Sequence, residues 1–412
     1  MVLFFSGIGR GHAQTETNYD ESLVPDYVLP ELVATIDGAP IMTVEAWERH
    51  RDDLLDRFAR EMYGRTPTDP IDVRYEVLAE NPNALNGKAT GKQINFIFTS
   101  GEKEVQAYLL LYLPNRATGP VPVFVGYNFK GNHSTIADPD IRYSPNFKLV
   151  RDVGHPDWER GNQATRWAFD DIIDRGYAIA TMCYHDIFPD QPGMKDHSIV
   201  SLFPGYGTAT EAPDEWQAIG AWAWGSSRIV DYLATEPRID AEQVAIMGHS
   251  RQGKAALWAG AQDPRFKVVI SNNSGEGGAA LSRRKYGERL ATVAGLQPAW
   301  FCPAFDQYHG REEERPIDQH QLIALMAPRA VYVASAEEDR WADPKGEYLS
   351  AYHASPVFEL YGHQGLPSVS MPDLHEPLMH HIGYHIRAGK HDVTRYDWLR
   401  YLDFADLHFQ RP

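Results

Sequence analysis

Apolar residues recur along the chain in two alternating patterns, and these patterns predict its secondary structure. Short runs rich in Val, Ile, Tyr and Phe predict strands, and longer stretches with apolar residues at helical spacing predict helices. The predicted strands are residues 75–80, 93–99, 105–113, 121–127, 177–183, 243–247, 267–271 and 329–334, followed by a last strand region flanked by 357–360 and 383–386. The predicted helices are residues 44–62, 167–174, 214–235 and 397–409, and a further helix begins at 255.

The order of these elements indicates an α/β protein. The first strands follow one another directly, which predicts an antiparallel start to the sheet. From residue 121 onward strands alternate with helices, which is typical of a doubly wound, mostly parallel sheet with helices on both faces. Residues 134–163 and 186–213 lack this periodicity, and we expect them to be inserted loops over the carboxyl ends of the strands.

The composition narrows the class of partner. The 412 residues include 39 Lys and Arg against 56 Asp and Glu, which gives a formal net charge of −17. Because nucleic acids and anionic membranes are themselves negatively charged, neither is expected as the main partner. No apolar run approaches the length of a membrane-spanning helix. The two cysteines, Cys183 and Cys302, predict either one disulfide or two buried free thiols.

The first twenty residues differ in character from the remainder of the chain. Their short apolar start and the small residues after it resemble the end of a secretory signal, although no basic region precedes them. We interpret residues 1–20 as a truncated signal, with a disordered N-terminus as the alternative. This interpretation predicts a secreted or periplasmic protein. Residues 21–412 are then expected to form a single domain, which we expect to be a monomer.

The segment 248–254, Gly-His-Ser-Arg-Gln-Gly-Lys, lies between a predicted buried strand and a predicted helix. A strand, a sharp glycine-flanked turn bearing Ser250, and a helix together indicate the nucleophile elbow of an α/β-hydrolase. Such a turn exposes the serine where a histidine can activate it, and the helix N-terminus favours the negative charge that develops during acyl transfer. Gly253 comes one residue later than in the common G-x-S-x-G form. The alternative is a serine in an ordinary strand-to-helix connection.

A triad acid is expected after a later strand, because α/β-hydrolases carry their triad in the order Ser, acid, His. The strand that ends near residue 335 is followed by three consecutive acids, Glu337, Glu338 and Asp339. We favour Asp339 because its spacing to Pro344 matches the turn that usually follows the acid, and Glu338 is the second candidate. The alternative is that these acids form a solvated turn.

His391 lies between the last predicted strand and the closing helix, where the general base of this fold belongs. It would take the proton from Ser250 while the acid orients its ring. The competitors His380, His381 and His385 are interpreted as packing or hydrogen-bonding residues around the last strand. Because an HExxH signature is absent, we expect no metal and no other cofactor. The polar loop 128–133 is expected to supply a backbone N–H to the oxyanion hole.

The sequence from Gly248 to Lys254 resembles the glucuronoyl esterases, carbohydrate esterase family 15, whose elbow reads G-[CH]-S-R-x-G-K and therefore has the same displaced glycine. The resemblance covers about residues 120–410. It continues through the segments 271–278, 300–302, 316–320, 327–329, 334–346 and 383–398.

The resemblance implies a role for several further residues. Arg251 would reach the oxyanion with its guanidinium as well as its backbone N–H, which is physically reasonable because a fixed cation stabilises developing negative charge. Lys254 and Glu288 would bind hydroxyls of the glucuronate ring, and Trp341 would contact that ring. The alternatives are a surface salt bridge for Arg251, a solvent-exposed helix carboxylate for Glu288, and simple packing for Trp341.

The chain also departs from the fungal members of this family. The position that matches their catalytic Glu is Asn273, which cannot act as a carboxylate, and Glu276 does not align with it. This resembles the bacterial variants whose acid lies after the later strand, which returns that role to Asp339 or Glu338. His249 stands where fungal members have a disulfide cysteine.

The resemblance implies a serine esterase that hydrolyses the ester between (4-O-methyl-)glucuronic acid of glucuronoxylan and lignin alcohols through an acyl-enzyme. An acetyl xylan esterase or a broad carboxylesterase is the alternative, and it predicts high activity on small acyl esters. A non-catalytic carbohydrate-binding protein is less favoured, because a binder has no need of a serine, a histidine and an acid together.

Overall fold

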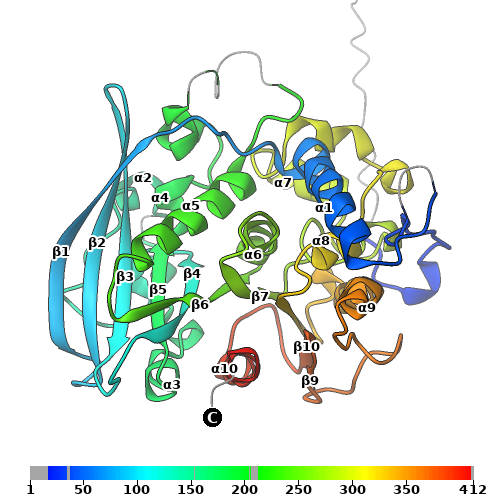
Figure 1. Ribbon diagram of the computed structural model, residues 1–412. Coiled ribbons are helices and arrows are strands. Elements are labelled where there is room, and N and C mark those ends of the chain that lie inside the picture. Colours follow the sequence, from blue (N-terminus) through cyan, green and yellow to red (C-terminus); the bar gives the residue numbers. More distant parts are fainter. Residues whose placement is uncertain (1–16, 35–37, 153, 204, 206–211, 410–412) are drawn as a thin grey trace, which may run out of the picture.

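The computed structural model describes residues 17–34, 38–152, 154–203, 205 and 212–409. Its centre is a ten-stranded sheet in the order β1-β2-β3-β5-β4-β6-β7-β8-β10-β9 (Figure 1). The strands are β1 (Asp72–Ala84), β2 (Ala89–Ser100), β3 (Lys103–Pro114), β4 (Val121–Asn128), β5 (Ala178–Cys183), β6 (Ile239–His249), β7 (Phe266–Asn272), β8 (Ala330–Ala336), β9 (Leu378–Met379) and β10 (Ile382–Arg387).

The sheet has the expected antiparallel start and a mostly parallel remainder, in which only the described edge strand β9 pairs antiparallel, with β10. Strands β1, β2, β3 and β5 pair antiparallel in that order, whereas β5, β4, β6, β7, β8 and β10 are all parallel. All eight residues of β4 are buried, as expected for a parallel strand covered on both faces. The predicted α/β-hydrolase class, with a mostly parallel sheet between helices, is confirmed.

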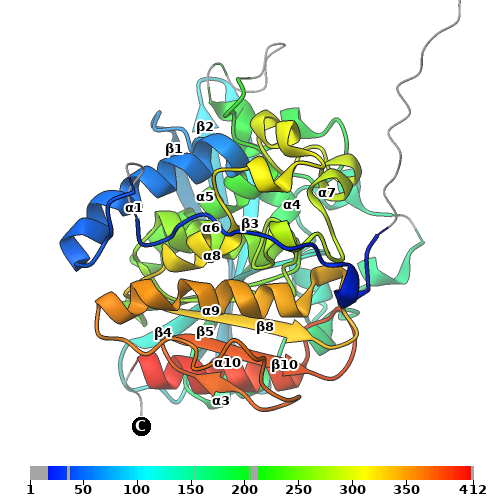
Figure 2. The same cartoon turned by 90° about the vertical axis from the view of Figure 1, so that its right-hand side faces the viewer.

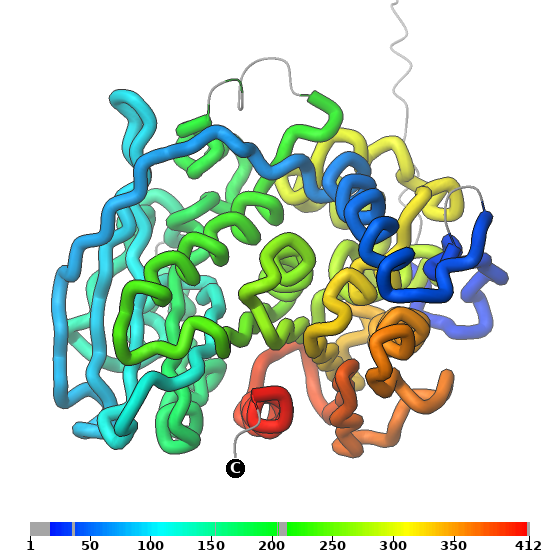
Figure 3. Tube along the Cα trace, in the orientation of Figure 1, coloured from blue at the N-terminus to red at the C-terminus, as the bar shows by residue number. Residues whose placement is uncertain are grey.

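Helices cover both faces of this sheet. The helices are α1 (Val44–Phe58), α2 (Phe147–Val150), α3 (Phe169–Asp174), α4 (Tyr184–Ile187), α5 (Ala218–Leu233), α6 (Arg251–Gln262), α7 (Leu290–Leu296), α8 (Gln319–Ala324), α9 (Pro344–Leu360) and α10 (Arg395–His408). A large apolar cluster joins one face to α1, α5, α6, α8 and α9, and a smaller one joins the other face to α3 and α10. The chain trace in Figure 3 shows α10 on the opposite side of the sheet from α6.

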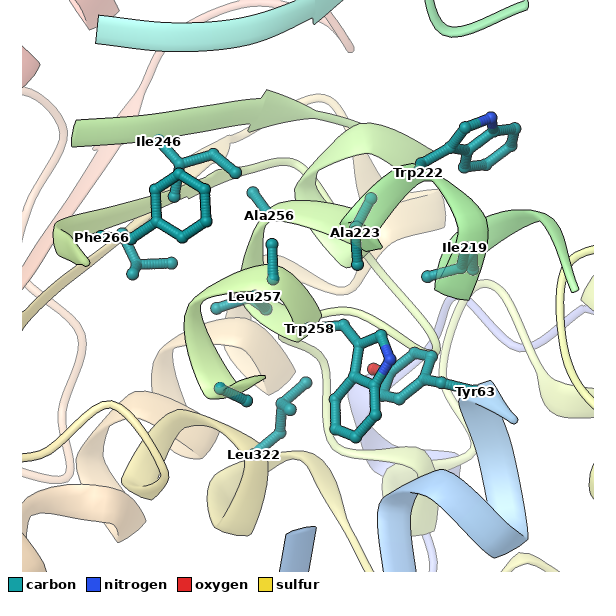
Figure 4. Close-up of a cluster of buried hydrophobic side chains, with 14 of the residues drawn as sticks. Tyr63, Ile219, Trp222, Ala223, Ile246, Ala256, Leu257, Trp258, Phe266 and Leu322 are labelled. Atoms are coloured by element: carbon teal, nitrogen blue, oxygen red, sulfur yellow. The ribbon is translucent and has the colours of Figure 1, made fainter. Parts of the chain in front are cut away.

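The helix α6 is the centre of the larger core. Its Trp258 stacks on Tyr63 with 4.7 Å between ring centroids, and both rings are fully buried (Figure 4). Leu257 packs in the same cluster, which also contains Leu322 of α8. Because α6 begins directly after Ser250, this packing fixes the position of the serine.

The N-terminal segment lies along the surface beside α8. His320 and Gln321 of α8 bond the backbone oxygens of Pro30 and Glu31, at 3.0 and 3.1 Å. Figure 2 shows this blue segment crossing the molecule near α8 and α9. Most of the segment predicted to be a signal, residues 1–16, lies outside the described residues.

One predicted element is wrong. Residues 357–360 do not flank the last strand, because they form the C-terminal turn of the 17-residue helix α9. The helix continues through Pro356, although a proline usually ends a helix. Here Val357 and Phe358 are fully buried, so that tertiary packing maintains the helix through the proline. Strand β1 is also longer than expected, because its exposed polar end still pairs with β2.

Two further findings concern the cysteines and the membrane. Cys183 and Cys302 are both buried free thiols, so the predicted disulfide alternative does not hold. Within the described ranges, the helices all lack the length and apolar character that crossing a bilayer requires.

Candidate active site

Ser250 occupies a strained turn between β6 and α6. Its φ of 57° and ψ of −129° lie where a side chain is rarely tolerated, as a nucleophile elbow requires. A Cβ on Gly248 would lie 1.9 Å from the backbone oxygen of Gln252. A Cβ on Gly253 would lie 2.9 Å from the Cβ of Ser274 and 3.1 Å from the oxygen of Gly248. The displaced second glycine therefore has the usual function, which is to let the helix pack closely against the turn.

The structure brings Asp339 and His391 together. Asp339 follows β8 and its side chain is 4% exposed, whereas His391 lies after β10 with its side chain 39% exposed. The His391 Nδ1 and the Asp339 Oδ2 are 2.6 Å apart, which leaves Nε2 free to act as a base. The neighbouring Glu338 is exposed. Its backbone N–H donates to the oxygen of Gly389 at 3.0 Å.

Asn273 contributes to the same carboxylate. It follows β7 with a φ of 47°, and its Nδ2 donates to Asp339 Oδ2 at 2.8 Å. Asn273 therefore holds the carboxylate of Asp339 as a hydrogen-bond donor. Sequence reasoning identified the position of Asn273 but not this hydrogen bond.

A cavity of about 390 Å³ joins these residues to the others predicted for the site. Its wall contains every predicted site residue except Glu338. The lining residues are Ser250, Arg251, Lys254, Asn273, Ser274, Glu288, Val293, Leu296, Gln297, Trp300, Asp339, Trp341, Ala342 and His391. Among the described residues, three larger hollows lie elsewhere on the surface, and none of them is lined by Ser250, Asp339 or His391.

Arg251, the first residue of α6, is held at the cavity wall by two neighbours. Its Nη1 donates to Oδ2 of Asp190, and its guanidinium carbon lies 4.7 Å from the ring centroid of Trp300. Asp190 and Trp300 are joined in turn by a hydrogen bond of 2.8 Å from the indole Nε1. The salt bridge proposed as an alternative for Arg251 is therefore real, but it lies at the cavity, with Asp190 buried and Arg251 partly exposed.

Lys254 and Glu288 form a second charged pair. The Lys254 Nζ donates to the backbone oxygens of Ser274 and Glu276, at 2.6 and 2.5 Å, and to Glu288 Oε2 at 3.1 Å. Since an ammonium has three N–H donors, all of them are occupied in this structure. The carboxylate of Glu288 is thus oriented by Lys254, and the Glu288 N–H donates to the backbone oxygen of Trp341 at 2.7 Å.

The polar loop after β4 lies beside the elbow. The Asn128 Oδ1 accepts from the backbone N–H of Gly131 at 2.8 Å, which holds the loop in a turn. Phe129 packs edge-on against His249 with 6.0 Å between ring centroids. This places backbone N–H groups of the loop on the same side of the sheet as Ser250.

The ring of His249 packs against the ring of His391, tilted by 42° to it. Their ring centroids are 4.5 Å apart, and the Nδ1 of His249 bonds Oδ1 of Asn272 at 2.6 Å. Burial lowers the pKa of His249 well below its ordinary value, with a further contribution from the neighbouring His391. The ring beneath His391 is therefore neutral, and it does not compete for the proton.

Glu347 of α9 is a buried carboxyl that the sequence did not indicate. Its Oε1 accepts from the backbone N–H groups of Ser274 and Gly275, at 2.7 and 3.0 Å, and the Ser335 Oγ donates to its Oε2 at 2.6 Å. Burial raises the pKa of Glu347 to about 8. It ties the loop after β7 to β8, and so supports the two segments that carry Asn273 and Asp339.

The other histidines near the last strand are packing and hydrogen-bonding residues, as expected. His385 is buried, and its Nε2 bonds Asp397 at 2.9 Å. His381 stacks on His363 with 3.6 Å between ring centroids. Across the described part of the chain, no group of three or more His, Cys, Asp or Glu side chains has an arrangement that could hold a metal ion.

Comparison with known proteins places this geometry in a family. Residues 197–362 match the family model described as glucuronyl esterase, fungi. The carbohydrate esterase MZ0003 from an unknown prokaryotic organism is 41% identical, over 95% of this chain and 92% of that protein.

Two solved structures extend the likeness over nearly the whole fold. A glucuronoyl esterase from Solibacter usitatus is 44% identical with a TM-score of 0.88, over 94% of this chain and all of that one. A protein described as a promiscuous esterase of carbohydrate esterase family 15, from a marine bacterial metagenome, is 40% identical with a TM-score of 0.86, over 95% of this chain and all of that one. The chain belongs to the glucuronoyl esterases of carbohydrate esterase family 15.

Proposed function

We propose that this protein hydrolyses the ester between (4-O-methyl-)glucuronic acid of glucuronoxylan and lignin alcohols, through an acyl-enzyme on Ser250. One observation carries the proposal. The His391–Asp339 hydrogen bond of 2.6 Å lies at the wall of a cavity that also presents Ser250 and Arg251. A base, its orienting acid, a nucleophile and a cation are thereby gathered in one cavity, as acyl transfer requires.

The chemistry proceeds in two halves. In the first, Nε2 of His391 takes the Oγ proton as Ser250 attacks the ester carbonyl, and it returns that proton to the alcohol when the carbon–oxygen bond breaks. In the second, His391 activates a water that releases the uronic acid and restores Ser250. Asp339 stabilises the imidazolium that forms in each half. Arg251 and backbone N–H groups stabilise the oxyanion.

The recognition of the sugar is assigned to other residues that line the same cavity. Glu288, oriented by Lys254, would accept hydrogen bonds from ring hydroxyls, and Trp341 would pack against the ring. All three N–H donors of Lys254 are already used within the protein. We therefore propose that Lys254 orients Glu288 and does not itself bind the sugar.

The proposed setting follows from the substrate. Glucuronoxylan and lignin lie outside the cell, which agrees with the signal-like start of the chain and with a secreted or periplasmic protein. We propose that residues 21–412 act as one catalytic domain and as a monomer. The mechanism uses only side chains and backbone of this chain, with no metal or cofactor.

Hydrolysis of benzyl glucuronate, measured beside para-nitrophenyl acetate, tests the proposal. Wild type should hydrolyse the uronate ester strongly and the acetate weakly, and Ser250→Ala should abolish both activities. If the acetate alone is hydrolysed, the enzyme is an acetyl or broad carboxylesterase. If Ser250→Ala retains wild-type turnover of the uronate ester, Ser250 is not the nucleophile.

A further inference from the structure

Asp190 collects three side-chain donors beside the nucleophile. It lies in the loop after α4, and its side chain is only 3% exposed. Its Oδ2 accepts from the Nη1 of Arg251 and, at 3.2 Å, from the hydroxyl of Tyr184, while its Oδ1 accepts from the Trp300 Nε1 at 2.8 Å. Its own backbone N–H donates to His185 Nδ1 at 2.9 Å, which anchors the loop at this point.

These contacts leave Arg251 little rotational freedom. The bond to Asp190 fixes one nitrogen of the guanidinium. The Trp300 ring, whose centroid lies 4.7 Å from the guanidinium carbon, packs against the guanidinium group. The ring of Phe129, from the loop after β4, also lies near the guanidinium, with 5.9 Å between its centroid and the guanidinium carbon. Among the residues that the structure describes, the Nε of Arg251 is buried without a hydrogen-bond partner. A buried N–H with no protein partner is costly, so Arg251 keeps this position only because its other contacts hold it there.

We propose that Asp190 is a positioning residue for catalysis, which holds the guanidinium of Arg251 where the oxyanion forms. The inference rests on the proposed function, in which Arg251 stabilises that oxyanion. A carboxylate serves this purpose better than an amide, since both of its oxygens accept hydrogen bonds and its charge offsets the burial of the cation. Because Asp190 also bonds Trp300, it positions the guanidinium of Arg251 directly through the ion pair and indirectly through the ring that faces it.

A purely structural ion pair would behave differently from a positioning pair. Loss of a structural pair would lower stability and leave the turnover of the folded enzyme unchanged. Loss of a positioning residue lowers kcat while KM is little changed, because the oxyanion exists only in the transition state. Its effect also disappears when Arg251 is absent, because Asp190 would then have nothing to position.

The experiment is a double-mutant cycle of Asp190→Asn and Arg251→Gln, with kcat and KM measured on benzyl glucuronate and on para-nitrophenyl acetate. Removing one oxyanion donor typically lowers kcat by about 10²–10³-fold. Since Asp190→Asn leaves Arg251 present but less well oriented, we expect a kcat about 10-fold lower and a KM within about twofold of wild type. In the Arg251→Gln background, Asp190→Asn should change kcat by less than about twofold.

Asp263→Asn is the matched control. It removes a buried carboxylate from Arg265 at the far end of α6, away from the cavity, and it should leave kcat unchanged. Should Asp190→Asn fail to fold, Asp190→Glu keeps the charge but displaces it, and the same non-additivity with Arg251→Gln is expected. An unchanged kcat, or an equal loss with and without Arg251, would overturn the proposal. If benzyl glucuronate is not hydrolysed, the proposed function fails, and the cycle is still decided on the acetate, which also passes through an oxyanion.

Discussion

Replacement of Asp339 by alanine tests the assignment of the triad acid. The substitution removes the carboxylate whose Oδ2 lies 2.6 Å from His391 Nδ1. The packing of the His391 ring against His249 is left in place. The imidazolium that forms during acyl transfer would then lose its counter-charge. The expected consequence is a lower kcat, because this charge pair exists only while His391 carries the proton.

The magnitude follows from the geometry. With their charge centres about 4 Å apart, a carboxylate and an imidazolium attract by about 4 kcal/mol at an effective dielectric constant of 20. Since about 1.4 kcal/mol corresponds to a factor of ten in rate, kcat should fall by about 10³-fold. Glu338→Ala is the matched control, since Glu338 is adjacent and exposed, and its kcat should stay within about twofold of wild type.

The assay is steady-state hydrolysis of benzyl glucuronate by wild type, Asp339→Ala and Glu338→Ala, with thermal unfolding to confirm that each variant is folded. If Asp339→Ala keeps more than about a tenth of the wild-type kcat, the Coulomb reasoning is refuted. If Glu338→Ala is the variant that loses activity, the acid has been assigned to the wrong residue.

Three further predictions concern the support of the site and its contact with the sugar. Gly248→Ala places a Cβ 1.9 Å from the Gln252 oxygen, so urea unfolding should show a loss of about 3 kcal/mol or more, whereas Gly295→Ala, which meets nothing within 4 Å, should be neutral or stabilising. Burial raises the pKa of Glu347 to about 8, so its contribution to stability is present at low pH and is lost as pH rises through 8. The melting temperature of Glu347→Gln should therefore fall less steeply than that of wild type between pH 5 and pH 8. An identical slope for the two proteins would contradict this. Glu288→Gln should raise the KM for benzyl glucuronate about 10-fold and leave the KM for para-nitrophenyl acetate unchanged, and equal changes on both esters would exclude a sugar contact.

The elements that sequence patterns predicted best are those with a strong local signal. Ser250 was identifiable because a strained turn needs small residues at fixed positions, and that need is visible within seven residues. Asp339 and His391 are 52 residues apart, yet each follows a predicted strand, and parallel strands bring their carboxyl ends to one edge. The sequence alone could not decide between Asp339 and Glu338, because adjacent residues in a turn differ only in where their side chains point.

The residues that sequence patterns missed depend on contacts between distant loops. Asp190 lies in a stretch without periodicity, and only the folded chain shows that it meets Arg251 and Trp300. Glu347 lies in α9, for which the pattern predicted no helix, and the last four residues of α9 were assigned to the flank of the last strand region. In both cases a buried carboxylate is acceptable only because donors from other segments surround it, and no local pattern records those donors.

The central claim is that a glucuronoyl group is transferred through one acyl-enzyme, and partitioning in aqueous methanol tests it most directly. Benzyl and allyl glucuronate would each be hydrolysed in the same water–methanol mixture, and the ratio of methyl glucuronate to glucuronic acid measured. We predict the same ratio from both esters, because both give the same glucuronoyl-enzyme on Ser250 before methanol or water attacks. A ratio that depends on the leaving alcohol would contradict a common acyl-enzyme, and with it the role assigned to Ser250.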